Sequence, residues 1–453
     1  MLRNLKKIIL FSVFLSIAVP VFSQGDKVPK NGPALANKDF RESYIMALDY
    51  YSYEYYLDAM PIFLRLLAQE RNNCNINFYV GMCMLNIVGK EKTKAIPYFE
   101  KASKKVDPNY SGNYKETAAP VHAFYYLAET YLYNYQIDEA ITNYKKFESY
   151  LVGKAADENK KADVLRQIDK CNLAKELIAK PINVTITAIP LANSSFSDYA
   201  PVASFDGKTV YFNTKRRGVT GGEKDYSGEY NSDIFFSAMK GEKWQKPKKL
   251  SGKINTKAAE GISYLSPDGK YMMFYRYSKK SADIFAVETG KKGKWGAPYK
   301  LGPNINSKYD ETSAYLNVEA NKLLFVSDRP GGYGGKDIYV SEKLSNGEWG
   351  PPLNLGPGIN TQFDEDSPFF DKDDRTLYFS SEGHKTMGGF DIFISTASDD
   401  GYWSEPENIG YPINTPFDDI YFKPTFNEKR AYYSTAKKGG FSDWDVYSIT
   451  FNK

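Results

Sequence analysis

The sequence predicts a two-part protein of the α + all-β class, in which a stack of helices precedes a five-bladed β-propeller. Two observations carry this prediction. Apolar residues recur at helical spacing from Asp39 to about residue 180. Beyond that point an Asp-aliphatic-aromatic triplet recurs in steps of 50, 54, 54 and 54 residues, starting at Asp233, Asp283, Asp337, Asp391 and Asp445. A fixed period of this size is the signature of a repeat architecture.

The first 23 residues have the features of a secretory signal peptide. Basic residues precede an apolar run from Ile8 to Val19, which is too short for a membrane-spanning helix. Cleavage is expected after Ser23, and residues 24–38 are expected to form a flexible lead. Removal of residues 1–23 lowers the formal charge from +4 to +1, because 56 basic and 55 acidic side chains remain. The mature chain is therefore expected to be exported, without an integral membrane span and without the charge that nucleic-acid binding needs.

Residues 39–180 are expected to form antiparallel helix pairs with a capping helix. In the clearest pair, apolar positions run from Phe124 to Tyr131 and again from Ala140 to Phe147. This spacing resembles the tetratricopeptide repeat, in which small residues lie where two helices approach closely. The resemblance implies three repeats with a cap at residues 155–179, which is the usual minimum for a stable stack. The three cysteines, Cys74, Cys83 and Cys171, fall in these helices and are expected to be small buried side chains, or a bridge from Cys171 to one of the others.

The tetratricopeptide resemblance also implies a concave groove lined by the first helix of each repeat. We expect this groove to bind a partner through a polar-aromatic surface. Its predicted lining residues are Arg41, Tyr44, Tyr51, Asn75, Phe78, His122, Tyr125, Glu129 and Tyr133. The alternative is that these tyrosines only cover the stack.

Residues 181–453 are expected to form the propeller. Each unit holds an alternating strand, a Gly-rich loop and the Asp-aliphatic-aromatic strand, and the first four units add a Trp-x-x-Pro segment, so each unit describes a four-stranded blade. The last unit lacks the Trp-x-x-Pro strand, while a surplus strand at residues 184–191 precedes the first unit. The simplest account is that residues 184–191 complete the last blade, because ring closure removes an exposed sheet edge. Six blades is the alternative count.

An acidic hinge that starts with asparagine recurs between blades, and it should lie on the same face of the disc as the Gly-rich loops. That face is a second candidate surface for a partner, with Arg216, Arg217, Arg329, His384, Asp310, Glu311, Asp364, Glu365, Asp418 and Asp419. A ring of acids could hold a cation such as Ca²⁺. The stronger explanation is structural, because a carboxylate in the same place in every blade commonly accepts hydrogen bonds from the adjacent turn. No metal is assigned, and the aspartate of each triplet is likewise expected to anchor a loop.

The units have the form D-E-x-S-P, D-G-K-x-L-Y-F-x-S, G-G-x-D-I-Y, W-x-x-P and L-G-x-x-I-N-T, which resembles the WD-like repeat of TolB-type propellers. The order of signal peptide, tetratricopeptide-like stack and propeller is similar to that of Bacteroidetes envelope proteins, including PorE-like components of type IX secretion and gliding. The resemblance implies a periplasmic or outer-membrane-associated assembly protein. Those relatives commonly continue into an OmpA-like domain that binds peptidoglycan, and this sequence ends at the last blade. Direct anchoring to the cell wall is therefore not expected.

The sequence gives little support for catalysis. The two histidines lie in different predicted domains, and no Gly-x-Ser-x-Gly elbow, His-Glu-x-x-His helix or phosphate loop occurs. We therefore expect a non-catalytic scaffold, without a cofactor, that binds other envelope proteins such as outer-membrane or secretion-apparatus components. The alternatives are a propeller that binds carbohydrate or peptidoglycan, and a glycan-acting enzyme with paired carboxylates.

Overall fold

The computed structural model describes residues 39–452, except residues 90, 152–154, 223, 225–226, 279, 291–292 and 426–429. The predicted signal peptide and flexible lead lie outside the described residues. The chain forms two compact units, which divide between Asn172 and Leu173, and residues 226–228 belong to the first unit. Among the described residues, no helix is long and apolar enough to cross a membrane.

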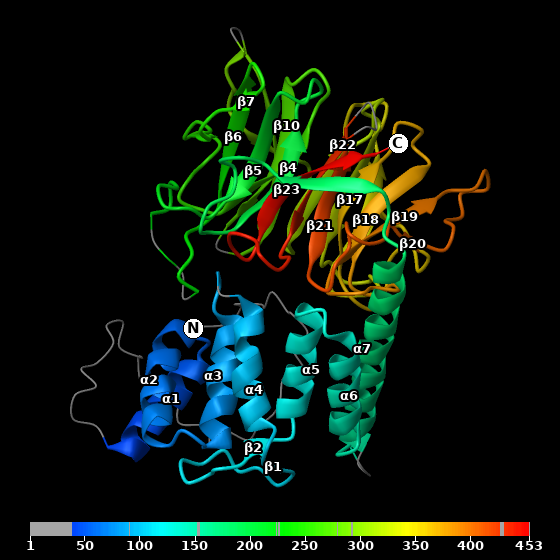
Figure 1. The fold of residues 1–453 in the computed structure, drawn as a ribbon. Helices are drawn as coiled ribbons and strands as arrows, with labels where there is room; N and C mark the ends of the chain where they lie inside the picture. Colours follow the sequence, from blue (N-terminus) through cyan, green and yellow to red (C-terminus); the bar gives the residue numbers. More distant parts are fainter. Residues whose placement is uncertain are drawn as a thin grey trace. The chain divides into compact units, whose positions relative to one another are not determined.

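The first unit consists of helix pairs (Figure 1). Its elements are α1 (Phe40–Ser52), α2 (Tyr56–Gln69), α3 (Cys74–Asn86), the 3-10 helix η2 (Lys92–Ala95), α4 (Ile96–Ala102), α5 (Ala123–Tyr133), α6 (Ile137–Glu148) and α7 (Ala155–Ala179). Asp39 and Asn73 cap α1 and α3 by accepting backbone N–H groups at 2.7 and 3.0 Å. Gly81 lets α3 pack closely on α4, because a Cβ at this position would lie 2.8 Å from the ring of Phe99. Three helix pairs followed by a longer helix is the predicted order, and it is confirmed. The three cysteines are buried and free, so the predicted alternative of a bridge from Cys171 is wrong.

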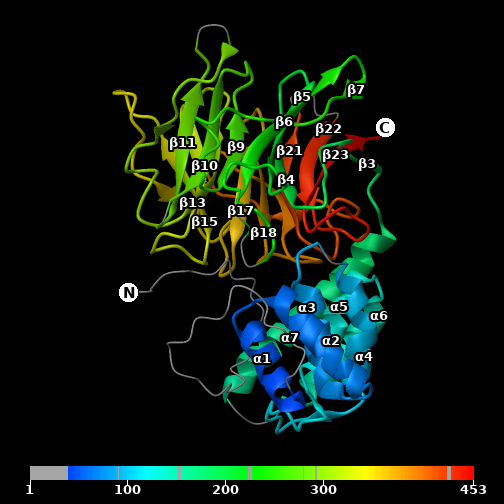
Figure 2. The ribbon, with the colours of Figure 1, turned by 90° about the vertical axis from the view of Figure 1, so that its left-hand side faces the viewer.

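The second unit contains five antiparallel sheets, each with four strands in the main path (Figures 1 and 2). Blade 1 is β4 (Asp198–Ala203), β5 (Thr209–Thr214), β6 (Asp233–Lys240) and β7 (Lys243–Trp244), with β8 (Lys248–Lys249) also on β6. Blade 2 is β9 (Glu260–Leu265), β10 (Tyr271–Tyr277), β11 (Ala282–Glu288) and β12 (Tyr299–Lys300). Blade 3 is β13 (Glu311–Leu316), β14 (Lys322–Ser327), β15 (Asp337–Glu342) and β16 (Leu353–Asn354). Blade 4 is β17 (Glu365–Phe370), β18 (Thr376–Ser381), β19 (Asp391–Thr396) and β20 (Glu407–Asn408).

Blade 5 closes the ring with a strand from the start of the unit. It contains β21 (Asp419–Pro424), β22 (Arg430–Thr435), β23 (Asp445–Phe451) and β3 (Val184–Ala188). β3 pairs antiparallel with β23, from Ala188 opposite Tyr447 to Val184 opposite Phe451. The innermost strands, β4, β9, β13, β17 and β21, contact one another in sequence, and β21 contacts β4. The five-bladed count and the closing strand are therefore confirmed, with the strand ending at Ala188 rather than residue 191.

The hinge asparagines join each blade to the one before it. In Asn360, Oδ1 accepts the N–H of Ile338 at 2.8 Å, and Nδ2 donates to the carbonyl of Ile338 at 2.9 Å. The same two bonds link Asn255 to Ile234, Asn306 to Ile284, Asn414 to Ile392 and Asn193 to Val446. The pair between Asn193 and Val446 joins the first blade to the last. We call this pair of hydrogen bonds the asparagine clamp. The clamp at Asn193 and the pairing of β3 with β23 together close the ring.

Candidate functional site

The chain itself fills much of the helical groove predicted from the sequence. Tyr44 and Asn75 lie in the interior of the first unit. The connection between α4 and α5, residues 103–122, contacts both of them. The Tyr44 hydroxyl donates to the carbonyl of Gly112 at 3.1 Å, and the Tyr110 hydroxyl donates to Asn75 Oδ1 at 2.5 Å. The Tyr44 hydroxyl and the Asn75 amide oxygen therefore bind the chain's own connection.

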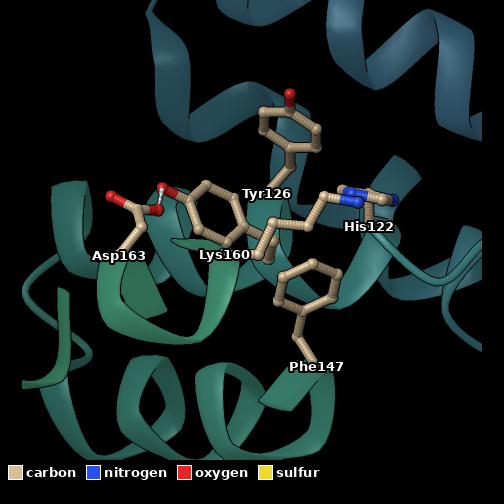
Figure 3. Close-up of a pocket in the computed structure, with 6 residues that line it drawn as sticks. His122, Tyr126, Phe147, Lys160 and Asp163 are labelled. Carbon is tan, nitrogen blue, oxygen red and sulfur yellow. Dashed lines mark hydrogen bonds between the residues drawn. The ribbon is translucent and has the colours of Figure 1, made fainter. Parts of the chain in front are cut away.

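Helix α7 contacts the side chains that α5 presents (Figure 3). The Tyr125 hydroxyl donates to Asp163 of α7 at 2.8 Å. Burial, and to a smaller extent the ammonium of Lys160, lowers the pKa of His122 to about 3, so this imidazole is neutral at pH 7. The cavity that remains has a volume of about 10 Å³, which is room for about one water molecule. Its lining residues are His122, Tyr125, Tyr126, Phe147, Lys160 and Asp163.

Five of the predicted groove residues are buried: Tyr44, Asn75, Phe78, His122 and Tyr125. The expectation that these five line an open groove is wrong, because the 103–122 connection, α7 and neighbouring aromatic rings cover them. Tyr51, Glu129 and Tyr133 are partly buried, and Glu129 accepts from the Tyr133 hydroxyl at 3.1 Å. Arg41 is exposed, with its guanidinium 5.4 Å from the ring of Tyr114 in the same connection.

The hinge carboxylate that begins the innermost strand of each blade serves its own blade. Glu365 accepts the N–H and the hydroxyl of Thr361 at 2.7 and 2.8 Å, and the hydroxyl of Ser381 at 2.7 Å. Glu311 and Asp419 accept from the equivalent serine and threonine, and all three carboxylates have an exposed fraction of 0 %. The expectation of an exposed partner-binding surface is therefore wrong for Glu311, Glu365 and Asp419. The structural explanation agrees with their contacts.

The first carboxylate of each hinge ties neighbouring blades together. Asp310, Asp364 and Asp418 are partly buried. Each accepts a backbone N–H at the start of the third strand of the preceding blade, from Ala282, Lys336 and Phe390 at 2.8, 2.9 and 3.0 Å respectively. These carboxylates are therefore engaged within the propeller instead of forming a ring of free oxygens. Within the described part of the chain, no group of three or more His, Cys, Asp or Glu side chains is arranged to hold a metal ion.

Two arginines of the predicted surface also serve their own blades. Arg329 donates to Glu311 at 3.2 Å and to the carbonyl of Ile305 at 2.6 Å, with its guanidinium 4.8 Å from the ring of Phe325. Arg216 pairs with Asp198 at 2.6 Å in the same way. These contacts correct the expectation that the two arginines are free for a partner. Arg217 is exposed.

Blade 4 differs, because His384 occupies the place of the arginine. Its Nε2 lies 2.9 Å from the carbonyl oxygen of Ile359, and burial lowers the pKa of His384. His384 is thus also engaged inside its blade, contrary to the predicted role. Glu365 has no cationic partner within 4.0 Å among the described residues, and burial raises the pKa of Glu365 to about 8. The pKa of this carboxyl therefore lies near neutral pH.

The aspartates of the recurring triplet anchor loops, as predicted, in four of the five blades. Asp337 accepts the N–H groups of Tyr333 and Gly334 at 2.6 and 3.0 Å, and the Asn354 amide at 2.7 Å. A loop N–H is accepted in the same manner by Asp233, Asp391 and Asp445. Asp283 instead pairs with the Lys300 ammonium at 2.8 Å. The recurring polar residues of the propeller are thus parts of its framework.

A pocket that sequence reasoning missed lies where the five innermost strands end. We call it the axial pocket; it has a volume of about 100 Å³ and all five blades contribute to its lining. Its wall includes the residue four positions after the carboxylate that begins each innermost strand: Val202, Tyr264, Tyr315, Phe369 and Lys423. Every innermost strand has a register shift between its first residue and this wall residue, and Ala200, Ser367 and Tyr421 have positive φ there. Bulges of this kind re-aim side chains next to functional sites.

Three of these residues form a continuous aromatic arc. The rings of Tyr264 and Tyr315 pack edge to face at 5.5 Å between centroids, and those of Tyr315 and Phe369 lie 4.6 Å apart. Lys423 completes the wall from blade 5, and its ammonium donates to the carbonyl of Ser263 in blade 2. Because blades 5 and 2 are not neighbours, the Lys423 side chain crosses the axis. The pocket therefore combines aromatic walls with one central cation.

Tyrosines on the strands that lead into the axial pocket pack together. The hydroxyls of Tyr199 and Tyr275 lie 3.0 Å apart, and the ring of Tyr199 lies 5.9 Å from that of Tyr421. Tyr275 comes from β10 and passes over Gly261, where a Cβ would lie 2.3 Å from its ring. Tyr199 and Tyr421 lie three and two residues before Val202 and Lys423, at the hinge side of the pocket wall. These tyrosines form a cluster of their own, and the lining of the axial pocket does not include them.

No protein-family model matches this sequence, and no curated protein matches it. Solved structures similar to the chain include a putative TolB from Agrobacterium tumefaciens, with 17% identity over 57% of this chain and 79% of that chain, and a TM-score of 0.36. An alpha-L-arabinofuranosidase from Lactobacillus brevis has 12% identity over 58% of this chain and 92% of that one, with a TM-score of 0.37. A xylan beta-1,4-xylosidase from Bacillus halodurans has 14% identity over 57% and 53%, with a TM-score of 0.38.

Proposed function

We propose that this protein is a non-catalytic scaffold of the cell envelope that binds other envelope proteins through the propeller face around the axial pocket. One observation carries the proposal. Phe205 of blade 1 and Val318 of blade 3 line the pocket and expose 59% and 49% of their surfaces. Exposed apolar side chains beside a pocket are typical of interaction sites. The opposite face, which carries the hinges, offers fewer groups to a partner, because most of its recurring charged side chains bind within the propeller.

The lining of the axial pocket favours binding over glycoside hydrolysis. Hydrolysis of a glycosidic bond generally uses a pair of carboxylates about 5 to 10 Å apart. Among the described residues that line the pocket, Asp371 is the one acid. A scaffold needs no such pair, and its apolar rim suits a protein surface.

Export and an envelope location are part of this proposal. They rest on the signal-peptide features of residues 1–23 and on the resemblance of the whole sequence to tetratricopeptide-propeller proteins of the PorE-like kind. Outer-membrane or secretion-apparatus components are the proposed partners. Mass spectrometry of the protein from the envelope fraction, with the N-terminus read at Gln24, tests the location.

Co-purification tests the scaffold. Tagged wild-type chain is recovered from membranes of its own cells, beside the double variant Phe205→Asp/Val318→Asp and the control Tyr402→Asp. Tyr402 is 78% exposed but does not line the pocket. We expect the control to retain the partners of the wild type and the double variant to lose them. Recovery of the wild-type chain alone and freely soluble would contradict the proposal.

Carbohydrate binding is the second candidate function, and the aromatic arc favours it, because aromatic side chains offer large apolar faces to a ligand. Titration with soluble peptidoglycan fragments tests this alternative. Binding that is abolished by Tyr315→Ala and unaffected by Tyr402→Ala would support it.

A further inference from the structure

We propose that the axial pocket binds a carboxylate group, with the Lys423 ammonium as its ion-pair partner and the aromatic arc as the wall for the ligand's apolar stem. The inference goes beyond the scaffold function, although both use the same face of the propeller. It assigns a ligand class to a site that the recurring motifs do not include.

The first argument is that Lys423 differs in residue type from the equivalent wall residues of the other four blades. At the position four residues after the hinge carboxylate, four blades carry Val202, Tyr264, Tyr315 and Phe369. Blade 5 carries Lys423 at this position, in a strand whose neighbours in the wall are apolar. A cation among apolar groups is costly unless it is paired or hydrogen-bonded. Lys423 thus departs from the repeat at the centre of a pocket.

The second argument is the unused hydrogen-bonding capacity of Lys423. An ammonium has three N–H donors, and the carbonyl of Ser263 is its acceptor in the structure. Among the described residues, no carboxylate lies within 4.0 Å of its Nζ. The Asp366 carboxylate is the acid that attracts it, but Asp366 accepts the hydroxyl of Ser313 at 2.5 Å and pairs with Lys336 at 3.7 Å. Two donors of Lys423 therefore remain for a ligand.

The electrostatics agree with an anionic ligand. Burial lowers the pKa of Lys423 to about 7, and the attraction of the Asp366 carboxylate opposes this shift only in part. Of the other charged groups in the lining, Lys372 adds a positive charge and Asp371 a negative charge. A bound carboxylate would supply the missing anion and favour the charged lysine.

The third argument is the shape of the site. The aromatic arc gives an apolar wall in the pocket that Lys423 also lines. Phe205 and Val318 extend the apolar surface to the rim. A ligand with a carboxylate at one end and an apolar stem would place its charge at the Lys423 ammonium and its stem along the arc. Free organic acids and the C-terminus of a peptide share this chemistry.

Calorimetric titration of the full mature chain with matched probes tests the assignment. The probes are hexanoate and hexanamide, and acetyl-Ala-Ala-Phe with a free carboxylate or with a terminal amide. We expect each acid to bind about tenfold or more tightly than its amide, because hydrogen bonds to charged groups are markedly stronger than neutral ones. Tighter binding of hexanoate would indicate a free organic acid, and tighter binding of the peptide acid would indicate a chain end.

Lys423→Met removes the charge and keeps an unbranched side chain of similar length. We expect this variant to bind acid and amide equally, while Lys385→Met, at an exposed lysine outside the pocket lining, keeps a preference within about threefold of that of the wild type. Equal binding of acid and amide by the wild type, an unchanged preference in Lys423→Met, or no binding of any probe at millimolar concentration would each overturn the assignment. The scaffold is tested separately, because partner capture lost in Phe205→Asp/Val318→Asp can be observed even when the wild type binds no probe.

Discussion

The hinge asparagines offer a quantitative test of how the blades are joined. Asn360 has an exposed fraction of 1% and binds both the N–H and the carbonyl of Ile338. In Asn360→Ala the carbonyl of Ile338 keeps the N–H of Leu355, at 3.1 Å, and the Asn354 amide oxygen keeps the N–H of Gly356, at 2.8 Å. The buried N–H of Ile338 loses its acceptor. One orphaned donor and the lost packing should lower the free energy of unfolding by roughly 2 to 4 kcal/mol.

Tryptophan fluorescence measures this loss in the propeller alone, because all five tryptophans lie between Trp244 and Trp444. Urea unfolding followed in this way should show a lower midpoint for Asn360→Ala with an unchanged slope. The control is Asn346→Ala, since Asn346 is exposed and binds within its own turn, to Glu348. We expect the control substitution to lower the free energy of unfolding by about 0.5 kcal/mol or less. Equal midpoints for the two variants would refute the reasoning that this clamp holds neighbouring blades.

Three further predictions concern the framework of the propeller. Asp337→Ala leaves the N–H groups of Tyr333 and Gly334 without an acceptor, so it should lower the free energy of unfolding by roughly 1 to 3 kcal/mol in the same urea assay. A urea midpoint equal to that of the parent would contradict this prediction. Gly261→Ala should displace Tyr275 and cost about 1 to 3 kcal/mol, whereas Gly302→Ala, with no atom within 4 Å of the added Cβ, should be near neutral. The pKa of Glu365 is raised to about 8, so its protonated form contributes stability that is complete below about pH 4.5 and is lost as pH rises to 8. Glu365→Gln should therefore reduce the fall in thermal midpoint between pH 5 and pH 8.5, and an identical fall in parent and variant would argue against a buried protonated carboxyl.

The repeat could be predicted because the blade is a unit of both sequence and hydrogen bonding. The Asp337 anchor and the Asn360 clamp each need one residue type at one position, so they recur visibly along the chain. The surplus strand at Val184–Ala188 could be assigned to blade 5 by counting alone. Sequence reasoning also anticipated that a carboxylate such as Glu365 binds its own turn.

The helical unit was harder to predict in detail. Helical spacing predicts the pairs, but it carries no information about the 103–122 connection, which contains the parallel pair β1 (Val106–Asp107) and β2 (Ala119–Pro120). This connection supplies Tyr110 and Gly112, whose bonds to α1 and α3 remove Tyr44 and Asn75 from the surface. A groove inferred from repeat geometry therefore fails where an irregular segment folds back on the stack.

The axial pocket was missed for the opposite reason, since its lining follows the repeat in position but not in residue type. Counting four residues from each hinge carboxylate finds all five wall positions, although the search for recurring residues passes over them. A recurring residue in a propeller is one that every blade needs to fold, as Asn360 and Glu365 are. A position that recurs in register while its residue changes is free of that requirement and available for a ligand. Lys423, the one charged residue at this position, is where the departure from the repeat is greatest, and it is there that the chemistry of the protein should be sought.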